Sequence, residues 1–211
     1  GCIDKTGQEI TPLKYDKIEI CKEGLIRAQS NDNWGLIDKT GRNISCLKYY
    51  CWFGPDQFED RFINGLMRVV SNDKWGLIDK TGKEITSIKY DYINPVSEGI
   101  VGVQLNRKWG FVNKNGKEIT AIKYDDIQNF KEGFAIVKVS KVIVFREGEF
   151  IKVKTDNKYG FVDKTGKEVT SLKYDWISDF NEGLAKVSLN KCGFINKTGK
   201  EVLPLKYDII C

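Results

Sequence analysis

The amino-acid sequence predicts an all-β protein built from repeated antiparallel hairpins, and three observations support this fold class. One phrase recurs along the 211 residues: residues 34–44 return with conservative changes as residues 75–85, 109–119, 159–169 and 192–202. Glycines recur at fixed positions between segments rich in β-branched and aromatic residues, as they do in tight hairpins. No window of about 11 residues or more shows the apolar period of an amphipathic helix.

The repeat organises the whole chain, residues 1–211, as a single array of about five and a half units. The units start at Gly1, Gly35, Gly76, Gly110, Gly160 and Gly193. Their spacing is 34 or 33 residues except in two units, which are 41 and 50 residues long. The longer units therefore carry insertions, near residues 50–61 and 140–155.

Each unit is predicted to form a three-stranded antiparallel meander. The first strand follows a Glu-Gly pair, as in residues 184–187, and the second runs through Trp-Gly or Tyr-Gly, as in residues 158–163. The third follows Thr-Gly. The turn at residues 38–41 has Asp first and Gly where a positive φ is needed, which suits a type I turn with a glycine bulge. The Lys-Tyr-Asp segment at residues 173–175 is expected to lead into a short fourth strand.

A three-stranded unit of this size cannot bury a sheet face alone, so neighbouring units are expected to stack. We expect an open solenoid-like array, with a β-propeller as the alternative. Propeller blades usually have four strands and about 40 residues or more, which is longer than the basic unit here. Both ends of the chain also carry the same half-unit, residues 1–15 and 193–207, rather than two halves that could complete one blade.

The recurring residues resemble the WG-repeat family, also called KWG repeats, of bacterial proteins. The resemblance is carried by [WY]-G-[FL]-[IV]-[DN]-K-[TN]-G-K-E-[IV], then [LI]-K-Y-D and F-x-E-G, and it covers nearly the whole chain. The chain departs from the motif in two ways. Cys192 and Tyr159 stand at the Trp position, and the two insertions lengthen their units. The resemblance implies a β-rich repeat array, often attached to other domains, with no established common activity.

The composition excludes several kinds of active site. The chain has no histidine, which removes Ser-His, Cys-His and most zinc-hydrolase chemistry. Its six cysteines form no C-x-x-C pair, and phosphate-loop and dinucleotide fingerprints are missing, so no catalytic, cofactor-binding or metal-ligating set is predicted. The same carboxylate recurs after Lys-Tyr in nearly every unit, at Asp16, Asp91, Asp125, Asp175 and Asp208. Such recurrence indicates a ladder in which the Lys and Asp of neighbouring Lys-Tyr-Asp segments, such as Lys173 and Asp175, lie beside each other, rather than one active site. We therefore expect no enzyme.

Charge, hydropathy and cysteine content limit which classes of partner and which cellular compartment are expected. The net charge of +5, from 34 basic and 29 acidic residues, is small and spread over the repeats, so no nucleic acid is expected. No apolar run approaches the roughly 20 residues of a membrane-spanning helix. Cysteines that behave as small core residues favour the cytoplasm, with the cell surface as the alternative. Because the chain starts at Gly1 without an initiator Met, we expect a leader or a neighbouring region to have been removed.

The insertions are the predicted binding sites. The recurring aromatic residues of the Trp-Gly strands share a face with apolar residues and are assigned to the core: Trp34, Trp75, Trp109 and Tyr159. The candidate partner-binding residues are aromatic in the first insertion and charged near the turn of a hairpin added by the second: Tyr50, Trp52, Phe53, Phe58, Arg146 and Glu149. We therefore predict a non-enzymatic repeat scaffold that mediates protein–protein interaction. The alternative is a cell-surface carbohydrate-binding module.

Overall fold

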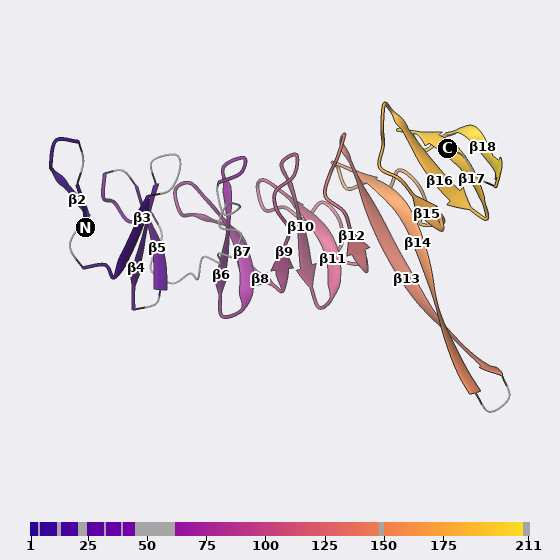
Figure 1. Ribbon diagram of the computed structural model, residues 1–211, viewed down its shortest axis with the longest axis horizontal. Helices are drawn as coiled ribbons and strands as arrows, with labels where there is room; N and C mark the ends of the chain where they lie inside the picture. The colour runs from indigo at the N-terminus through magenta and orange to yellow at the C-terminus, as the bar shows by residue number, and fades with distance from the viewer. Residues whose placement is uncertain are drawn as a thin grey trace. The chain divides into compact units, whose positions relative to one another are not determined.

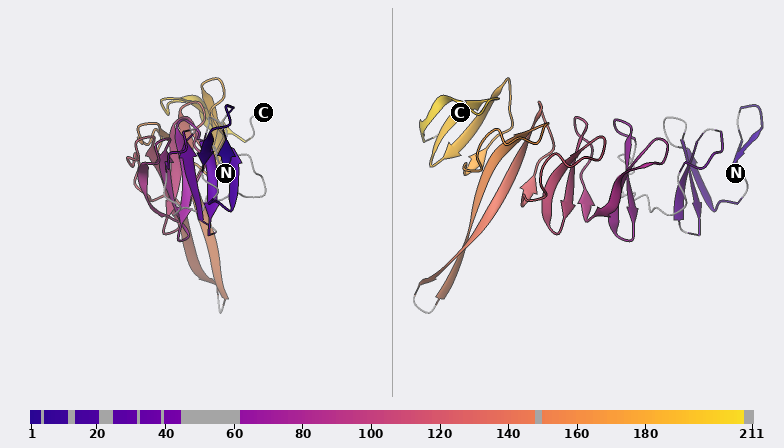
Figure 2. Two further views of the ribbon diagram at one scale, coloured as in Figure 1. Left: turned by 90° about the vertical axis from the view of Figure 1, so that its left-hand side faces the viewer. Right: turned by 180° about the vertical axis from the view of Figure 1, so that it is seen from behind.

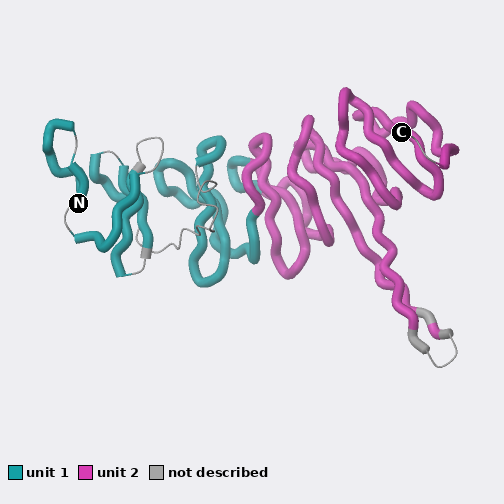
Figure 3. Tube along the Cα trace, viewed as in Figure 1, with its two compact units in different colours: residues 1–93, 114–117 teal, residues 94–113, 118–211 magenta. Residues whose placement is uncertain are grey.

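A computed structural model describes residues 1–3, 5–11, 14–20, 25–31, 33–38, 40–44, 62–147 and 150–208. Every regular element in these ranges is a β-strand, so the predicted all-β class is confirmed (Figure 1). The described part of the chain holds no helix that could cross a bilayer. The chain divides into two compact units, residues 1–93 with 114–117 and residues 94–113 with 118–211, and each is described by itself (Figure 3).

The first unit is built from short antiparallel strands. Its strands are β1 (Cys2–Ile3), β2 (Glu9–Thr11), β3 (Lys17–Ile20), β4 (Leu25–Ser30), β5 (Asn33–Asp38), β6 (Leu66–Ser71), β7 (Lys74–Asp79), β8 (Glu84–Tyr90) and β9 (Tyr92–Ile93). They include a two-stranded sheet, β1-β2, and two three-stranded sheets, β3-β4-β5 and β6-β7-β8. Each three-stranded sheet is antiparallel and contains one Trp-Gly strand.

The second unit repeats this arrangement with one much longer hairpin. Its strands are β10 (Ile100–Leu105), β11 (Lys108–Asn113), β12 (Asp126–Ile127), β13 (Phe134–Glu147), β14 (Phe150–Asp163), β15 (Trp176–Ile177), β16 (Leu184–Leu189), β17 (Lys191–Asn196) and β18 (Glu201–Tyr207). Strands β10 and β11 form a hairpin. The remaining sheets have the orders β12-β13-β14 and β15-β16-β17-β18.

The order of strands within a sheet differs partly from the prediction. The hairpin between the Glu-Gly strand and the Trp-Gly strand is present as predicted, for example in β10-β11 and β16-β17. The short strand after Lys-Tyr-Asp is also present and flanks this hairpin, as β12 and β15 do. The strand after Thr-Gly is continuous in β8 and β18, but next to β14 only two isolated bridges remain, Val162 to Glu168 and Tyr159 to Tyr174.

A buried threonine hydroxyl ties this third segment to the Trp-Gly or Tyr-Gly strand. Four residues after the turn glycine, each of Thr86, Thr120 and Thr170 is buried. Each threonine Oγ1 accepts a hydrogen bond from the backbone N–H that follows Trp-Gly or Tyr-Gly, and the N–H of Phe161 lies 3.0 Å from Thr170 Oγ1. The side chain thus satisfies a buried backbone donor, within the continuous strand β8 as well as beside β14.

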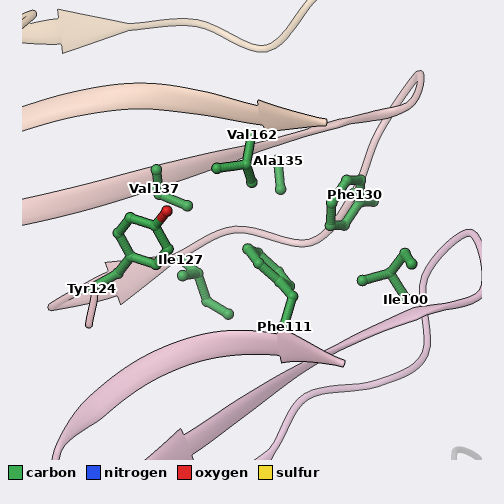
Figure 4. Close-up of a cluster of buried hydrophobic side chains, with 8 residues drawn as sticks. All are labelled: Ile100, Phe111, Tyr124, Ile127, Phe130, Ala135, Val137 and Val162. Atoms are coloured by element: carbon green, nitrogen blue, oxygen red, sulfur yellow. The ribbon is translucent and has the colours of Figure 1, made fainter. Parts of the chain in front are cut away.

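The core of the second unit is shared between successive repeats. One cluster comprises Ile100, Phe111, Tyr124, Ile127, Phe130, Ala135, Val137 and Val162 (Figure 4). These side chains come from the repeats that start at Gly76, Gly110 and Gly160. Tyr124 is among the largest fully buried side chains, at 1% exposure, and Tyr174 occupies the same place in the next cluster. No single repeat therefore contains a complete core here.

The glycine of the Thr-Gly turn brings two repeats into backbone contact. A Cβ added at Gly166 would overlap the carbonyl oxygen of Ile119, and one at Gly199 would lie 2.6 Å from the carbonyl oxygen of Val169. Both glycines have a positive φ, of 86° and 79°. In each case the carbonyl belongs to the preceding repeat, so the turn rests directly on its neighbour's backbone.

The Glu-Gly turn makes a second link between repeats. Glu98 and Gly99 both have positive φ, as a two-residue type I′ turn requires, although this conformation is uncommon for glutamate. The Glu98 carboxylate accepts a hydrogen bond from the backbone N–H of Gly133 at 3.0 Å and an ion pair from Lys164 at 2.9 Å. These contacts with the two following repeats offset the backbone strain at Glu98.

The aspartate of the Thr-Gly turn accepts three hydrogen bonds, and an asparagine accepts the same three in the last repeat. Asp79 Oδ1 accepts hydrogen bonds from the N–H and hydroxyl of Thr81 and from the N–H of Lys83, at 2.6 to 3.1 Å. Asn196 Oδ1 accepts the equivalent three bonds. The hydrogen bond from the Thr81 hydroxyl holds the pKa of Asp79 below its usual value of 3.8. The predicted turn with its positive-φ glycine is present here, because Gly82 has a φ of 82°.

We expect Gly166→Ala to destabilise the chain more than Gly183→Ala. Both glycines have φ near 85°, so both substitutions carry the same backbone strain, about 1–2 kcal/mol. Only the Gly166 variant meets the neighbouring carbonyl, since nothing lies within 4 Å of an added Cβ at Gly183. The Gly166 variant should lose roughly 1–3 kcal/mol more in urea unfolding. Equal losses would show that the turn does not rest on Ile119.

We expect the Asp79→Asn variant to have the wild-type free energy of unfolding at neutral pH. In acid, this free energy should fall less steeply in the variant than in the wild type. Because the folded pKa of Asp79 is lowered, its contribution is present above pH 3.8 and disappears as the pH falls through the folded value. Asparagine keeps the acceptor, as Asn196 does, and does not titrate. Asp79→Ala is the control and should already lose about 1–2 kcal/mol at pH 7. Urea unfolding over this pH range checks both, and identical acid slopes for wild type and Asp79→Asn would contradict the account.

Candidate binding surface

The recurring aspartates are paired with lysines, but with different lysines from those the sequence analysis assigned. Asp125 forms an ion pair with Lys108 at 2.5 Å, and Asp175 forms one with Lys158 at 2.6 Å. Both lysines directly precede the Trp or Tyr of the second strand. Asp91 with Lys74 and Asp208 with Lys191 repeat the pair. The lysine of Lys-Tyr-Asp instead lies over the adjacent tyrosine ring, as Lys173 does at 5.0 Å from the centroid of Tyr174. The predicted pairing between lysines and aspartates of neighbouring Lys-Tyr-Asp segments is therefore wrong.

The second carboxylate oxygens of Asp125 and Asp175 each bond to another hairpin. Asp125 Oδ2 accepts the N–H of Ser140 at 2.8 Å, and Asp175 Oδ2 accepts the N–H of Asn190 at 3.1 Å. Together with the lysines, these bonds lower the pKa of both carboxyls. Each aspartate therefore connects two segments of the repeat, and both of its oxygens are engaged.

A buried tyrosine and a glutamate of the following repeat form a third link. The Tyr124 hydroxyl donates to Glu168 Oε1 at 3.0 Å, and Lys123 Nζ lies 2.7 Å from the same oxygen. Burial and then the charge of Glu168 raise the pKa of Tyr124 well above its usual value of 10. The hydrogen bond from Lys123 lowers the pKa of Glu168. At neutral pH, Tyr124 is therefore a neutral phenol and Glu168 an ionised carboxylate, and the hydrogen bond between them links the two repeats.

The recurring tryptophans lie at the edge of the core rather than inside it. Trp109 is half-buried and packs against the cluster of Tyr124, whereas Phe111, two residues later, is fully buried. The guanidinium groups of Arg27 and Arg68 lie over the rings of Trp34 and Trp75, at 4.8 and 5.7 Å from the centroids. The contacts of these tryptophans are thus with an arginine in two repeats and with the core in the third.

Cysteines and acidic groups form no recognisable metal site within the described ranges. Cys2 and Cys192 are free thiols and are half-buried. The other four cysteines, Cys21, Cys46, Cys51 and Cys211, lie outside the described residues. No group of three or more potential ligands occurs in the part of the chain that the structure describes.

Most of the predicted partner-binding residues cannot be placed in the fold. Tyr50, Trp52, Phe53 and Phe58 of the first insertion and Glu149 of the second lie outside the described residues, and their role stays a prediction. Arg146 is described: it is exposed on β13 and pairs with Ile151 of β14.

The second insertion lengthens an existing hairpin instead of adding a new one. Strands β13 and β14 are 14 residues long, whereas the equivalent strands β16 and β17 have 6 residues each. The two long strands pair without interruption from Phe134 with Asp163 to Glu147 with Phe150. We call residues 140–147 and 150–157 the arm. The arm extends away from the sheets of its unit in each view of Figures 1 and 2.

The two faces of the arm differ chemically. Val142 and Val144 are two residues apart and therefore lie on the same face, and Val144 pairs with Val153 of the opposite strand. These three valines are 61, 61 and 64% exposed. The other face carries the exposed lysines Lys141 and Lys154 together with Ile143, which pairs with Lys154 and is 38% exposed. The arm therefore presents an apolar valine face to water, and its opposite face mixes lysines with Ile143.

The sequence analysis singled out the charged tip of this hairpin and missed the valines. The signal was present in the sequence, because residues 151–155 alternate apolar or Thr residues with Lys as an amphipathic strand does. A second exposed side chain is Trp176 on β15, which is 50% exposed.

Comparison with known proteins identifies the repeat. The family described as WG containing repeat matches residues 1–34, 75–109, 109–142, 159–191 and 193–210. Residues 143–158, which make up most of the arm, lie between two of these matches. No curated protein matches the chain.

One similar solved structure is the extracellular domain of a putative hybrid two-component system from B. thetaiotaomicron. It shares 9% identity with a TM-score of 0.29, and the alignment covers 96% of this chain and 30% of that one. The chain thus spans about a third of that structure's length. Because the family matches extend over most of the sequence and the described sheets recur with them, this chain belongs to the family of WG-containing repeat proteins.

Proposed function

We propose that this chain is a non-enzymatic scaffold that binds another protein through the arm. The observation that carries the proposal is the exposed apolar face of the arm, formed by Val142, Val144 and Val153. A hairpin of 6-residue strands is sufficient for the repeat, as β16 and β17 show, so the additional length of β13 and β14 is not needed to build the sheet.

The energetics of the arm favour a partner. An isolated two-stranded hairpin is marginally stable in water, and exposed valines gain stability only when a surface covers them. Exposed apolar side chains that gather on one face mark interaction sites more often than scattered ones do.

The remaining chemistry supports a scaffold rather than an enzyme. The carboxylates that recur along the chain are engaged by lysines, backbone N–H groups and a tyrosine hydroxyl, as at Asp125, Asp175 and Glu168. Their lowered pKa values are those of ionised structural groups and not of a proton donor tuned toward neutral pH.

Removing the arm should abolish partner capture and leave the repeats folded. Replacing residues 140–157 by Asn-Gly removes the arm and joins Val139 to Lys158 through a type I′ turn. This pair corresponds to Leu105 and Lys108, which flank the two-residue turn between β10 and β11. In proximity labelling, the partners enriched by the intact chain should be lost with this variant, while its melting temperature stays close to that of the wild type. The triple substitution Val142→Thr, Val144→Thr and Val153→Thr keeps the arm and should lose most of the capture. Unchanged capture by both variants would refute the proposal.

Trp176 favours a second candidate function, carbohydrate binding. It is a large aromatic side chain with half of its surface in water, and such rings stack on sugars. If the chain binds a glycan there, soluble oligosaccharides should change the tryptophan fluorescence of the wild type and not that of Trp176→Ala. A response that is the same in both proteins would remove this candidate.

A further inference from the structure

We propose that the arm binds an extended protein segment in which apolar and acidic residues alternate, and that this segment adds a strand to the outer edge of β14. This inference rests on the proposed function and names the chemistry of the partner.

The outer edge of β14 is open along the arm. Residues 151–157 of β14 pair with β13 on one side. On the other side, the first bridge that the structure describes is that of Tyr159 with Tyr174, at the base of the arm. Among the described strands, none covers this stretch of β14. Because no described strand pairs with this edge, it can serve as a template for another strand.

The side chains of this edge alternate between two kinds. Lys152 and Lys154 lie on one face, and Val153 and Thr155 lie on the other. A strand added beside them also alternates its side chains between the two faces. Apolar residues of that strand would extend the valine face, and acidic residues would lie beside the two lysines, where opposite charges stabilise cross-strand pairs. The period of the sheet thus fixes the pattern of the partner.

Charge disfavours a second copy of this chain at the same edge. Two antiparallel β14 edges aligned so that Val153 of one meets Val153 of the other would place Lys152 beside Lys154, and like charges across strands are destabilising. Lysines on an exposed edge also prevent edge-to-edge association in many β-proteins. The valine face alone offers on the order of a few hundred Å², well below the roughly 800 Å² per partner of a stable interface. An acidic partner removes the repulsion and uses both faces.

The probes are two labelled peptides that differ only in charge. One is Thr-Glu-Val-Glu-Val-Glu-Thr with blocked ends, and the other has Lys in place of each Glu. Binding to the full chain is measured by fluorescence anisotropy, and the site is located by amide chemical shifts. We expect the acidic peptide to bind about tenfold or more tightly than the basic one, with shifts concentrated in residues 151–155 and weaker binding at high salt.

Charge reversal provides the sharper test. The double variant Lys152→Glu with Lys154→Glu should bind the basic peptide in preference to the acidic one. The control Lys167→Glu with Lys200→Glu has the same net charge and changes two exposed lysines of Thr-Gly turns in the second unit, so it should keep the wild-type preference.

Several results would overturn the inference. They are equal binding of the two peptides, an unchanged preference after reversal, or shifts in residues 141–145 of β13 instead of β14. Arm-dependent dimerisation in sedimentation, or arm-dependent binding to anionic vesicles with neither peptide bound, would assign the arm to another occupant. If partner capture requires the arm but the peptides do not discriminate, the inference fails and the proposed function stands. If capture does not require the arm, the proposed function fails whatever the peptides do.

Discussion

The structure depends on one constraint: no repeat of this chain can bury its own sheet, so each must complete its core with a neighbour. Within the second unit, the cluster around Tyr124 draws side chains from three successive repeats. The contact that fixes their spacing is steric, because the turn at Gly166 rests on the backbone of Ile119 with no room for a side chain. Hydrogen bonds and ion pairs, such as those of Glu168 and Glu98, then fix the register between repeats.

This constraint explains why the same charged residues recur along the chain. A group repeated in every unit serves the junction that is repeated in every unit, and Asp125 and Asp175 each hold a lysine and a backbone N–H. Function is then expected where the chain departs from its repeat. The arm is such a departure within the described residues, since it adds length that no junction requires and exposes Val142, Val144 and Val153.

Local features of the fold were predictable from the sequence, and long-range pairings were not. The turns at Gly82 and Gly166 and the hairpins that follow Glu-Gly are set by neighbouring residues, so the sequence pattern predicts them. The partner of Asp125 is Lys108 because β11 and the segment after it meet in a register that no local signal encodes. The hydrogen bond from the N–H of Phe161 to the buried hydroxyl of Thr170 is likewise a contact that no local signal encodes. For the binding surface, composition indicated the second insertion, but the exposed valines follow from the continuous pairing of β13 with β14.

Native-state hydrogen exchange on a chain truncated after residue 175 tests the central claim most directly. The truncation keeps the sheet β12-β13-β14 whole and removes β15 to β18, whose side chains pack against Ile136 and Phe161. If every repeat completes its core with a neighbour, protection in residues 134–139 and 158–163 should fall sharply, whereas protection in β10 and β11 should stay close to that of the full chain. Protection of residues 134–139 and 158–163 that is unchanged by the truncation would contradict the account, because it would mean that a sheet holds its core alone.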